Sequence, residues 1–240
     1  MKIAALEKLT LIDYPNHLAA IIFTVSCNFR CHYCYNPMLV WPKKGSGKKD
    51  KNEKAYSLIS ENELFQFLKY RQGKLEGLVI TGGEPTLQPD LETFIAKVKD
   101  LGYLVKLDTN GTRPEIVARL LDKKLIDYIA MDFKAPIEDY KKVVNVNLDF
   151  RKIAKSVKMI AGSKIGHEFR TTVLPQLLSP ADIEKMAKYL PKNSKWYLQQ
   201  FKSESDLVNM NYKKFSAYSD KDMESLVNIA KKYIKNTNWR

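Results

Sequence analysis

Residues 77–111 read GLVITGGEPTLQPDLETFIAKVKDLGYLVKLDTNG, and their pattern is the most informative about the fold. Two short apolar runs, at 77–81 and 104–108, are typical of buried strands, and the amphipathic segment between them, about 89–101, is typical of a helix. A strand, a helix and a strand at this spacing indicate a right-handed βαβ unit with two parallel strands. The rest of the chain repeats this alternation.

The alternation predicts an α/β fold built on six strands. Strands are expected at 19–24, 77–81, 104–108, 128–133, 168–173 and 195–199, and helices at about 60–71, 89–101, 114–123, 149–161, 180–190 and 220–234. Prolines at 89, 114 and 180 suit first helical turns. Six βα units are too few for a closed eight-fold barrel, so the pattern leaves an open, partial barrel or a doubly wound sheet.

A single domain is expected over residues 1–240, because this length can bury one core. The DYPN turn at 13–16 predicts an N-terminal hairpin around residues 1–18, and residues 202–240 form an expected C-terminal extension with a helix. The lysine-rich stretch KKGSGKKDKNEK at 43–54 has few apolar residues, so we expect a mobile basic loop.

Composition favours a cytoplasmic protein with no membrane segment. The start of the chain lacks the apolar segment of a secretory signal, and no apolar run approaches the roughly 20 residues that span a bilayer. The net charge is +13, but the basic residues are spread along the chain and no aromatic-interleaved basic motif appears. Nucleic acid is therefore a disfavoured partner.

Unusual polar residues follow the carboxyl ends of the expected strands. They include Cys27, the TGGEP turn at 81–85, the DTNG turn at 108–111, the pair Asp132 and Lys134, and the glutamines at 199 and 200. Ligands and chemistry lie at this edge of parallel α/β folds. These segments are therefore expected to form one site although they are distant in sequence.

All three cysteines lie in the stretch CNFRCHYC at 27–34, as Cys27, Cys31 and Cys34. Structural thiols are one interpretation, and a zinc site is another, although His32 lies between two of the cysteines and could not easily reach the same metal. A 4Fe–4S cluster fits better because thiolates are its preferred ligands. Three cysteines would leave one iron open to a small molecule.

With these residues the chain resembles the radical S-adenosylmethionine (radical SAM) superfamily, whose CxxxCxxC loop and glycine-rich turn match CNFRCHYC and TGGEP. It most resembles the activases of glycyl radical enzymes, and among them the group that activates anaerobic ribonucleoside-triphosphate reductase. That similarity runs from LTLIDYP at 9–15 to YLQQF at 197–201. It implies a partial (β/α)6 barrel, a 4Fe–4S cluster on the cysteines, and reductive cleavage of SAM to a 5′-deoxyadenosyl radical that forms a glycyl radical on a partner.

The resemblance also assigns residues to a SAM site. Glycines allow close backbone approach, and a carboxylate beside them could hold the ammonium group of SAM. The expected SAM-binding residues are Tyr33, Gly82, Gly83, Glu84, Asp108, Asn110, Lys134, Arg170 and Gln200. Similarity to pyruvate formate-lyase activase further implies a monovalent cation held by Asp108, Thr109 and Asp132. A helix-capping or turn role for Asp108 is the competing interpretation.

Two departures from the relatives matter. The segment LQQFKSES after the sixth strand has no histidine where pyruvate formate-lyase activase has one, so Gln199 or Gln200 is the expected substitute. The chain has no fourth cysteine, which excludes a second cysteine-ligated cluster. The electron is therefore expected from an external flavodoxin or ferredoxin.

Two other functions stay open from the sequence. One is a small-molecule radical SAM enzyme similar to 7-carboxy-7-deazaguanine synthase, which also uses a compact barrel. The other is a metal-binding interaction protein that uses its basic surface on nucleic acid.

Overall fold

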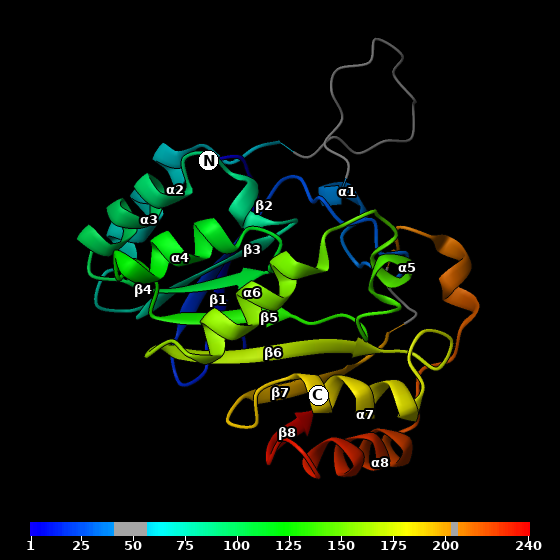
Figure 1. Ribbon diagram of the computed structural model, residues 1–240. Helices are drawn as coiled ribbons and strands as arrows, with labels where there is room; N and C mark the ends of the chain where they lie inside the picture. Colours follow the sequence, from blue (N-terminus) through cyan, green and yellow to red (C-terminus); the bar gives the residue numbers. More distant parts are fainter. Residues whose placement is uncertain (41–56, 203–205) are drawn as a thin grey trace.

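The computed structural model describes residues 1–40, 57–202 and 206–240, and in it eight strands form one sheet in sequence order (Figure 1). β1 pairs with β2 in antiparallel fashion, and every later pair is parallel. The outermost strands, β1 and β8, do not pair with each other, so the barrel is open. The strands are β1 (Ile3–Thr10), β2 (Ala19–Thr24), β3 (Gly77–Gly82), β4 (Leu104–Thr109), β5 (Tyr128–Asp132), β6 (Gly166–Val173), β7 (Lys195–Gln200) and β8 (Asn236–Trp239).

Helices follow the parallel strands (Figure 1). The longer ones cover the outer face of the sheet, whereas the short α1 and α5 lie beside the loop that follows β2. They are α1 (Pro37–Val40), α2 (Glu61–Arg71), α3 (Leu91–Asp100), α4 (Pro114–Asp122), α5 (Tyr140–Val144), α6 (Phe150–Ala161), α7 (Pro180–Tyr189) and α8 (Asp220–Lys231), with 3₁₀ turns at Pro85–Leu87 and Met210–Lys214. Serine N-caps with capping boxes begin α2, α7 and α8. Each cap satisfies backbone N–H groups that the first helical turn leaves unpaired.

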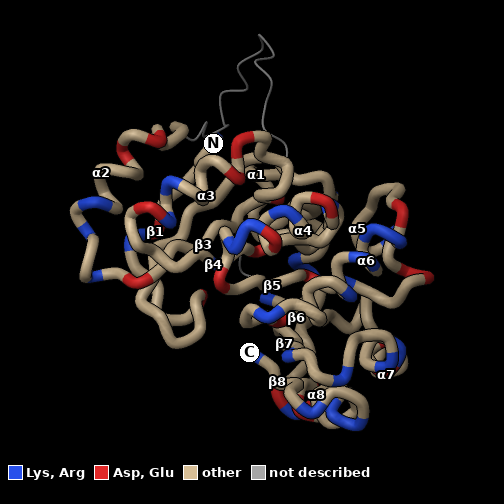
Figure 2. The backbone as a smooth tube through the Cα atoms, turned by 60° about the vertical axis from the view of Figure 1, so that its left-hand side comes forward, with Lys and Arg blue, Asp and Glu red and all other residues tan. Residues whose placement is uncertain are grey.

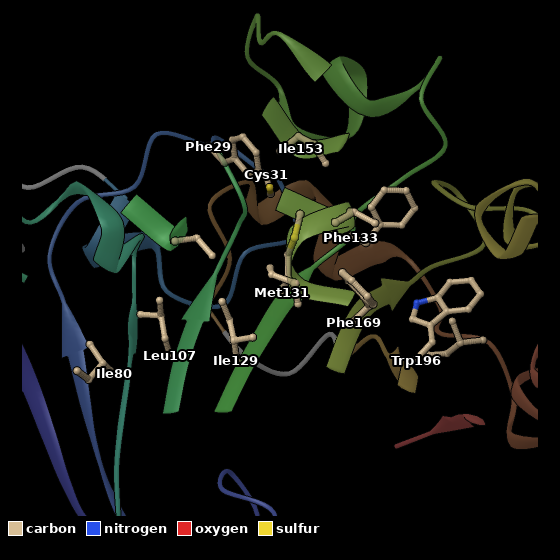
Figure 3. Close-up of a cluster of buried hydrophobic side chains, with 14 of the residues drawn as sticks. Phe29, Cys31, Ile80, Leu107, Ile129, Met131, Phe133, Ile153, Phe169 and Trp196 are labelled. Carbon is tan, nitrogen blue, oxygen red and sulfur yellow. The ribbon is translucent and has the colours of Figure 1, made fainter. Parts of the chain in front are cut away.

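The main core lies between the sheet and these helices. Figure 3 shows apolar side chains of β3 to β6 and of α6 in this layer, among them Ile80, Leu107, Ile129, Ile153 and Phe169, all fully buried. Because side chains alternate along a strand, the neighbours of these residues point to the inside of the open barrel.

The inner face changes character along the strands. Near their amino ends it is apolar, with Tyr14, Ile21, Val79 and Tyr128 in one buried cluster. Toward their carboxyl ends charged side chains replace apolar ones. The fold therefore directs polar chemistry to one end of the barrel.

The six expected parallel strands and the N-terminal hairpin are confirmed, with the hairpin formed by β1 and β2. The final helix is shorter than the predicted 220–234, because α8 ends at Lys231 and β8 follows it. Pro89 precedes the N-cap Asp90 and is not in the first turn of α3. The basic loop expected at 43–54 lies outside the described residues.

The placement of charged residues and the hydropathy of the described helices agree with what the sequence predicts. Lys and Arg occur along most elements and are interspersed with Asp and Glu (Figure 2). Within the described parts of the chain, no helix has the length and apolar character needed to cross a membrane.

Candidate functional site

A cavity of about 710 Å³ lies at the carboxyl ends of β2 to β7. It brings together every site residue that the sequence predicts, from six separate segments of the chain. These are Cys27, Cys31, Tyr33, Cys34, Gly82, Gly83, Glu84, Asp108, Thr109, Asn110, Asp132, Lys134, Arg170, Gln199 and Gln200.

The cysteine loop follows β2 and is held by backbone bonds from three parts of the chain. Ser26 N–H donates to the Leu39 carbonyl of α1 at 2.9 Å, and Arg30 N–H donates to the Val144 carbonyl of α5 at 2.9 Å. From the C-terminal segment, Val208 N–H donates to the Cys34 carbonyl at 3.1 Å. The cysteines therefore lie on a loop fixed on several sides.

The three thiols are free and largely buried. Burial raises the pKa of Cys27 to about 12 and that of Cys31 to about 11, and the ammonium group of Lys134 partly offsets both shifts. Thiols at such pKa values need bound metal to become thiolates at neutral pH.

The donor set suits a cluster better than a single ion. Within the described residues, no three His, Cys, Asp or Glu side chains lie close enough to bind one metal ion. A 4Fe–4S cluster instead takes each thiolate on a separate iron, so its ligands surround a larger group. His32 contacts Asn145 Nδ2 through Nε2 at 2.9 Å.

The glycine-rich turn packs directly against the start of the cysteine loop. Gly83 N–H donates to the Thr24 carbonyl at 2.8 Å, and Glu84 N–H donates to the Ser26 carbonyl at 2.7 Å. A Cβ atom at Gly82 would lie 2.2 Å from Thr24 N, and one at Gly83 would lie 2.0 Å from Ser26 O. Glycine is therefore needed at both positions because the neighbouring backbone passes so close. From the sequence alone, the expected reason for these glycines is the close approach of a ligand instead.

Glu84 is fully buried, and hydrogen bonds within the protein occupy its carboxylate. Oε1 accepts from the backbone N–H and the hydroxyl of Thr86 and from the Thr109 hydroxyl, and Oε2 accepts from Asn110 N–H at 2.6 Å. Burial raises the pKa of Glu84, and these bonds counteract the shift. The carboxylate thus links the turn after β3 to the turn after β4.

Asn110 extends this link to the cysteine loop. Its Nδ2 donates to Asn28 Oδ1 at 2.8 Å, and its Oδ1 accepts from Thr112 N–H at 3.0 Å. Asn28 lies directly after Cys27. The DTNG turn therefore braces the loop that carries the cysteines.

Five charged side chains form an alternating row across β4, β5 and β6. Lys106 Nζ contacts Asp108 at 2.7 Å, and Arg170 bridges Asp108 and Asp132 with one 3.0 Å contact to each. Lys134 Nζ contacts Asp132 at 3.1 Å and lies over the Tyr33 ring at 5.9 Å. The row joins the inside of the barrel to the cysteine loop.

Ion pairing affects the pKa of the two aspartates in this row more than desolvation does. Burial alone would raise the pKa of both aspartates. Lys134 and Arg170 instead hold the pKa of Asp132 at about 2, and Arg170 and Lys106 lower the pKa of Asp108. Both carboxylates are therefore ionised at neutral pH.

Sequence reasoning missed Lys106 and Arg240. Lys106 interrupts the apolar run of β4 two residues before Asp108, a signal for a shared inner face. Arg240 follows β8, lines the cavity and contacts the buried Glu168 at 3.0 Å. The sequence offers no reason to place Arg240 at the site, because its position depends on β8 and that strand was not predicted.

The two glutamines that end β7 differ in their contacts. Gln200 Nε2 donates to the Tyr218 carbonyl at 2.7 Å and to Asp220 at 3.2 Å, so its amide holds the segment before α8. Gln199 pairs in register with Thr172 of β6, and both line the cavity. Gln199 shares the inner face with Arg170 because alternate residues of a strand point the same way.

Residues 21–190 match the family model of the radical SAM superfamily. A Methanocaldococcus jannaschii protein named as a glycyl-radical enzyme activating enzyme is 34% identical over 240 residues, covering 98% of this chain and 93% of its own. The pyruvate formate-lyase-activating enzyme of Clostridium pasteurianum is 29% identical over 193 residues, covering 79% of this chain and 76% of its own.

Solved structures show the same fold at low identity. SuiB of Streptococcus suis superposes with a TM-score of 0.62 at 16% identity, covering 92% of this chain and 48% of SuiB. TYW1 superposes with a TM-score of 0.58 at 15% identity, covering 90% of this chain and 74% of TYW1.

The cysteine set and the cavity fit the two cofactors of this superfamily, a 4Fe–4S cluster and SAM. The family match covers most of the sheet and includes the cysteine loop, the glycine-rich turn and the charged row. The chain therefore belongs to the radical SAM superfamily of enzymes.

Proposed function

We propose that the protein activates a glycyl radical enzyme and that its partner is an anaerobic ribonucleoside-triphosphate reductase. The observation that carries the proposal is the 34% identity to a named activating enzyme, which extends over 98% of this chain. The choice of reductase rests on the motifs LIDYP, LDTNG, AMDFKAP and LQQF.

When bound, the cofactors would supply the radical chemistry: the cluster would provide an electron, and SAM would provide the 5′-deoxyadenosyl group that takes a hydrogen atom from the partner's glycine. The chain's own residues bind and orient. Cys27, Cys31 and Cys34 would hold the cluster, and the backbone of the glycine-rich turn would take the ammonium group of SAM, because the Glu84 carboxylate is already occupied. Lys134 and Arg170 offer positive charge to the SAM carboxylate.

Two features of the cavity support a protein partner. A cavity of about 710 Å³ would have to hold both the cluster and SAM, so a further substrate would approach from outside. The end of β1 and the turn after it expose Leu9, Leu11 and Ile12, whose exposed fractions are 47%, 68% and 81%, and Ile12 also lines the cavity. Apolar side chains at the mouth of a site favour contact with another protein.

The external reductant would be a flavodoxin or ferredoxin. The chain has three cysteines, and all three belong to the proposed cluster, so no second cysteine-ligated cluster can relay electrons within it.

Electron paramagnetic resonance tests the proposal. The cluster-loaded protein, SAM and a reductant are mixed with the host's anaerobic reductase, and a glycyl doublet should appear on the reductase. The Cys31→Ala chain is the matched control and should give none. A doublet on pyruvate formate-lyase alone would reject the named partner but keep the activase class. Turnover of a small molecule without any protein radical would reject both.

A further inference from the structure

We propose that the ammonium group of Lys106 takes the place of the monovalent cation that similarity to pyruvate formate-lyase activase implies at Asp108, Thr109 and Asp132. SAM binding by this enzyme would then need no added sodium or potassium. The inference rests on the proposed SAM site and not on the identity of the partner.

All four carboxylate oxygens of the two aspartates already have a cationic partner from the chain. Asp108 Oδ1 contacts Lys106 Nζ at 2.7 Å, and its Oδ2 contacts the Arg170 guanidinium at 3.0 Å. Asp132 Oδ1 contacts the same guanidinium at 3.0 Å, and its Oδ2 contacts Lys134 Nζ at 3.1 Å.

The third expected cation ligand is also engaged. The Thr109 hydroxyl donates to Glu84 Oε1 at 2.8 Å and accepts from Gly111 N–H at 3.1 Å. These bonds direct the oxygen into the link between the two turns. The three residues therefore do not fit a metal ion in this arrangement.

Charge leads to the same conclusion. Lys106, Lys134 and Arg170 carry three positive charges against the two of Asp108 and Asp132, so the row has one positive charge in excess. Another cation would double that excess where water screens it poorly. The carboxylate of SAM would instead neutralise it.

Lys106 is held in this position by the fold. Its side chain is 2% exposed, and the carboxylate of Asp108 is its ion-pair partner. It pairs in register with Tyr128 of β5 and lies 6.0 Å from that ring. Burying a charged ammonium group costs free energy unless a counter-charge pairs with it, so Lys106 and Asp108 form one unit.

The first test uses the unmodified, cluster-loaded enzyme. SAM binding is measured by calorimetry in potassium, sodium or choline chloride at one ionic strength, because salt itself screens charge. We expect the dissociation constant to change by less than about two-fold among the three salts. Binding that is about ten-fold tighter in potassium or sodium than in choline would overturn the inference. Absence of SAM binding in every salt would instead reject the proposed SAM site.

The second test removes the ammonium group. Lys106→Met should weaken SAM binding in choline chloride, and potassium or sodium should restore it by about ten-fold. Lys123→Met is the matched control, because Lys123 pairs with Glu92 on the surface and its loss should leave SAM binding independent of the salt.

A readout without SAM completes the design. Potassium should raise the unfolding temperature of cluster-loaded Lys106→Met above its value in choline, but not that of the unmodified chain, because an ion stabilises the state that binds it. Lys106→Gln gives the same comparison if the Met variant does not fold. Weakened SAM binding that neither ion restores, or a variant with no ion dependence at all, would show that Lys106 does not replace a cation.

Discussion

The Glu84 carboxylate accepts the backbone N–H of Asn110 at 2.6 Å, and this bond joins the turns that follow two neighbouring strands. Thr86 and Thr109 donate to the other oxygen, so one buried group holds the glycine-rich turn, the DTNG turn and the end of β4 together. Each donor is an N–H or O–H group, and only an acceptor can satisfy all of them.

Glu84→Gln should therefore destabilise the fold. The amide replaces one acceptor oxygen with a donor, which leaves a buried N–H unsatisfied, and we expect a loss of about 1–3 kcal/mol in the free energy of unfolding. Urea unfolding measures it. Glu115→Gln is the control, because Glu115 is exposed and its contact with Arg113 is 3.7 Å long. Equal stability of the two variants would contradict a structural role for the Glu84 carboxylate.

Gly83→Ala should disrupt the site through a steric clash. Its Cβ atom would lie 2.0 Å from the Ser26 carbonyl oxygen, which is backbone and cannot turn aside. We expect a loss of about 1–3 kcal/mol, together with lower iron content after reconstitution, because the cysteine loop must shift.

Gly73→Ala separates this clash from backbone strain. Gly73 has a φ of 73° but nothing within 4 Å of its Cβ position, so it carries only the conformational cost of about 1–2 kcal/mol. It should keep full iron content. Loss of iron in Gly73→Ala, or normal iron in Gly83→Ala, would reject close packing of the glycine-rich turn as the reason for Gly83.

The three cysteines should be needed for metal binding, whereas His32 should not. Changing Cys27, Cys31 or Cys34 to Ser should abolish the brown cluster after anaerobic reconstitution, measured by visible absorption and iron analysis. His32→Ala should retain both, because the imidazole contacts Asn145 and not the cavity. A colourless protein that contains zinc, and loses it in His32→Ala, would favour a Cys₃His zinc site instead.

The sequence could predict that these residues share one rim of the sheet, because the carboxyl ends of parallel strands must meet at one edge. Asp108 and Asp132 lie on adjacent strands as expected. It could not predict the partners within that rim. The bridge of Arg170 to both aspartates depends on the register of β6 against β5, which the sequence does not give. The edge strand β8 was not predicted because it has only four residues, and three of them are polar.

The glutamines at the end of β7 illustrate the same difference. In the sequence LQQF, either glutamine could reach the site. The structure distinguishes them because neighbouring residues of β7 point to opposite faces of the sheet. Gln199 shares the inner face with Arg170, whereas the Gln200 amide holds the Tyr218 carbonyl.

Gln199→Ala should therefore weaken SAM binding more than Gln200→Ala. A single hydrogen bond from Gln199 to the ligand corresponds to about 0.5–1.5 kcal/mol, or roughly a two- to ten-fold rise in the dissociation constant. Gln200→Ala should leave SAM affinity unchanged but lower the unfolding temperature, since it frees the segment before α8 from β7. Calorimetry and thermal unfolding on the cluster-loaded variants measure the two effects separately. The reverse result, with SAM affinity lost in Gln200→Ala and kept in Gln199→Ala, would assign the missing histidine's place to Gln200.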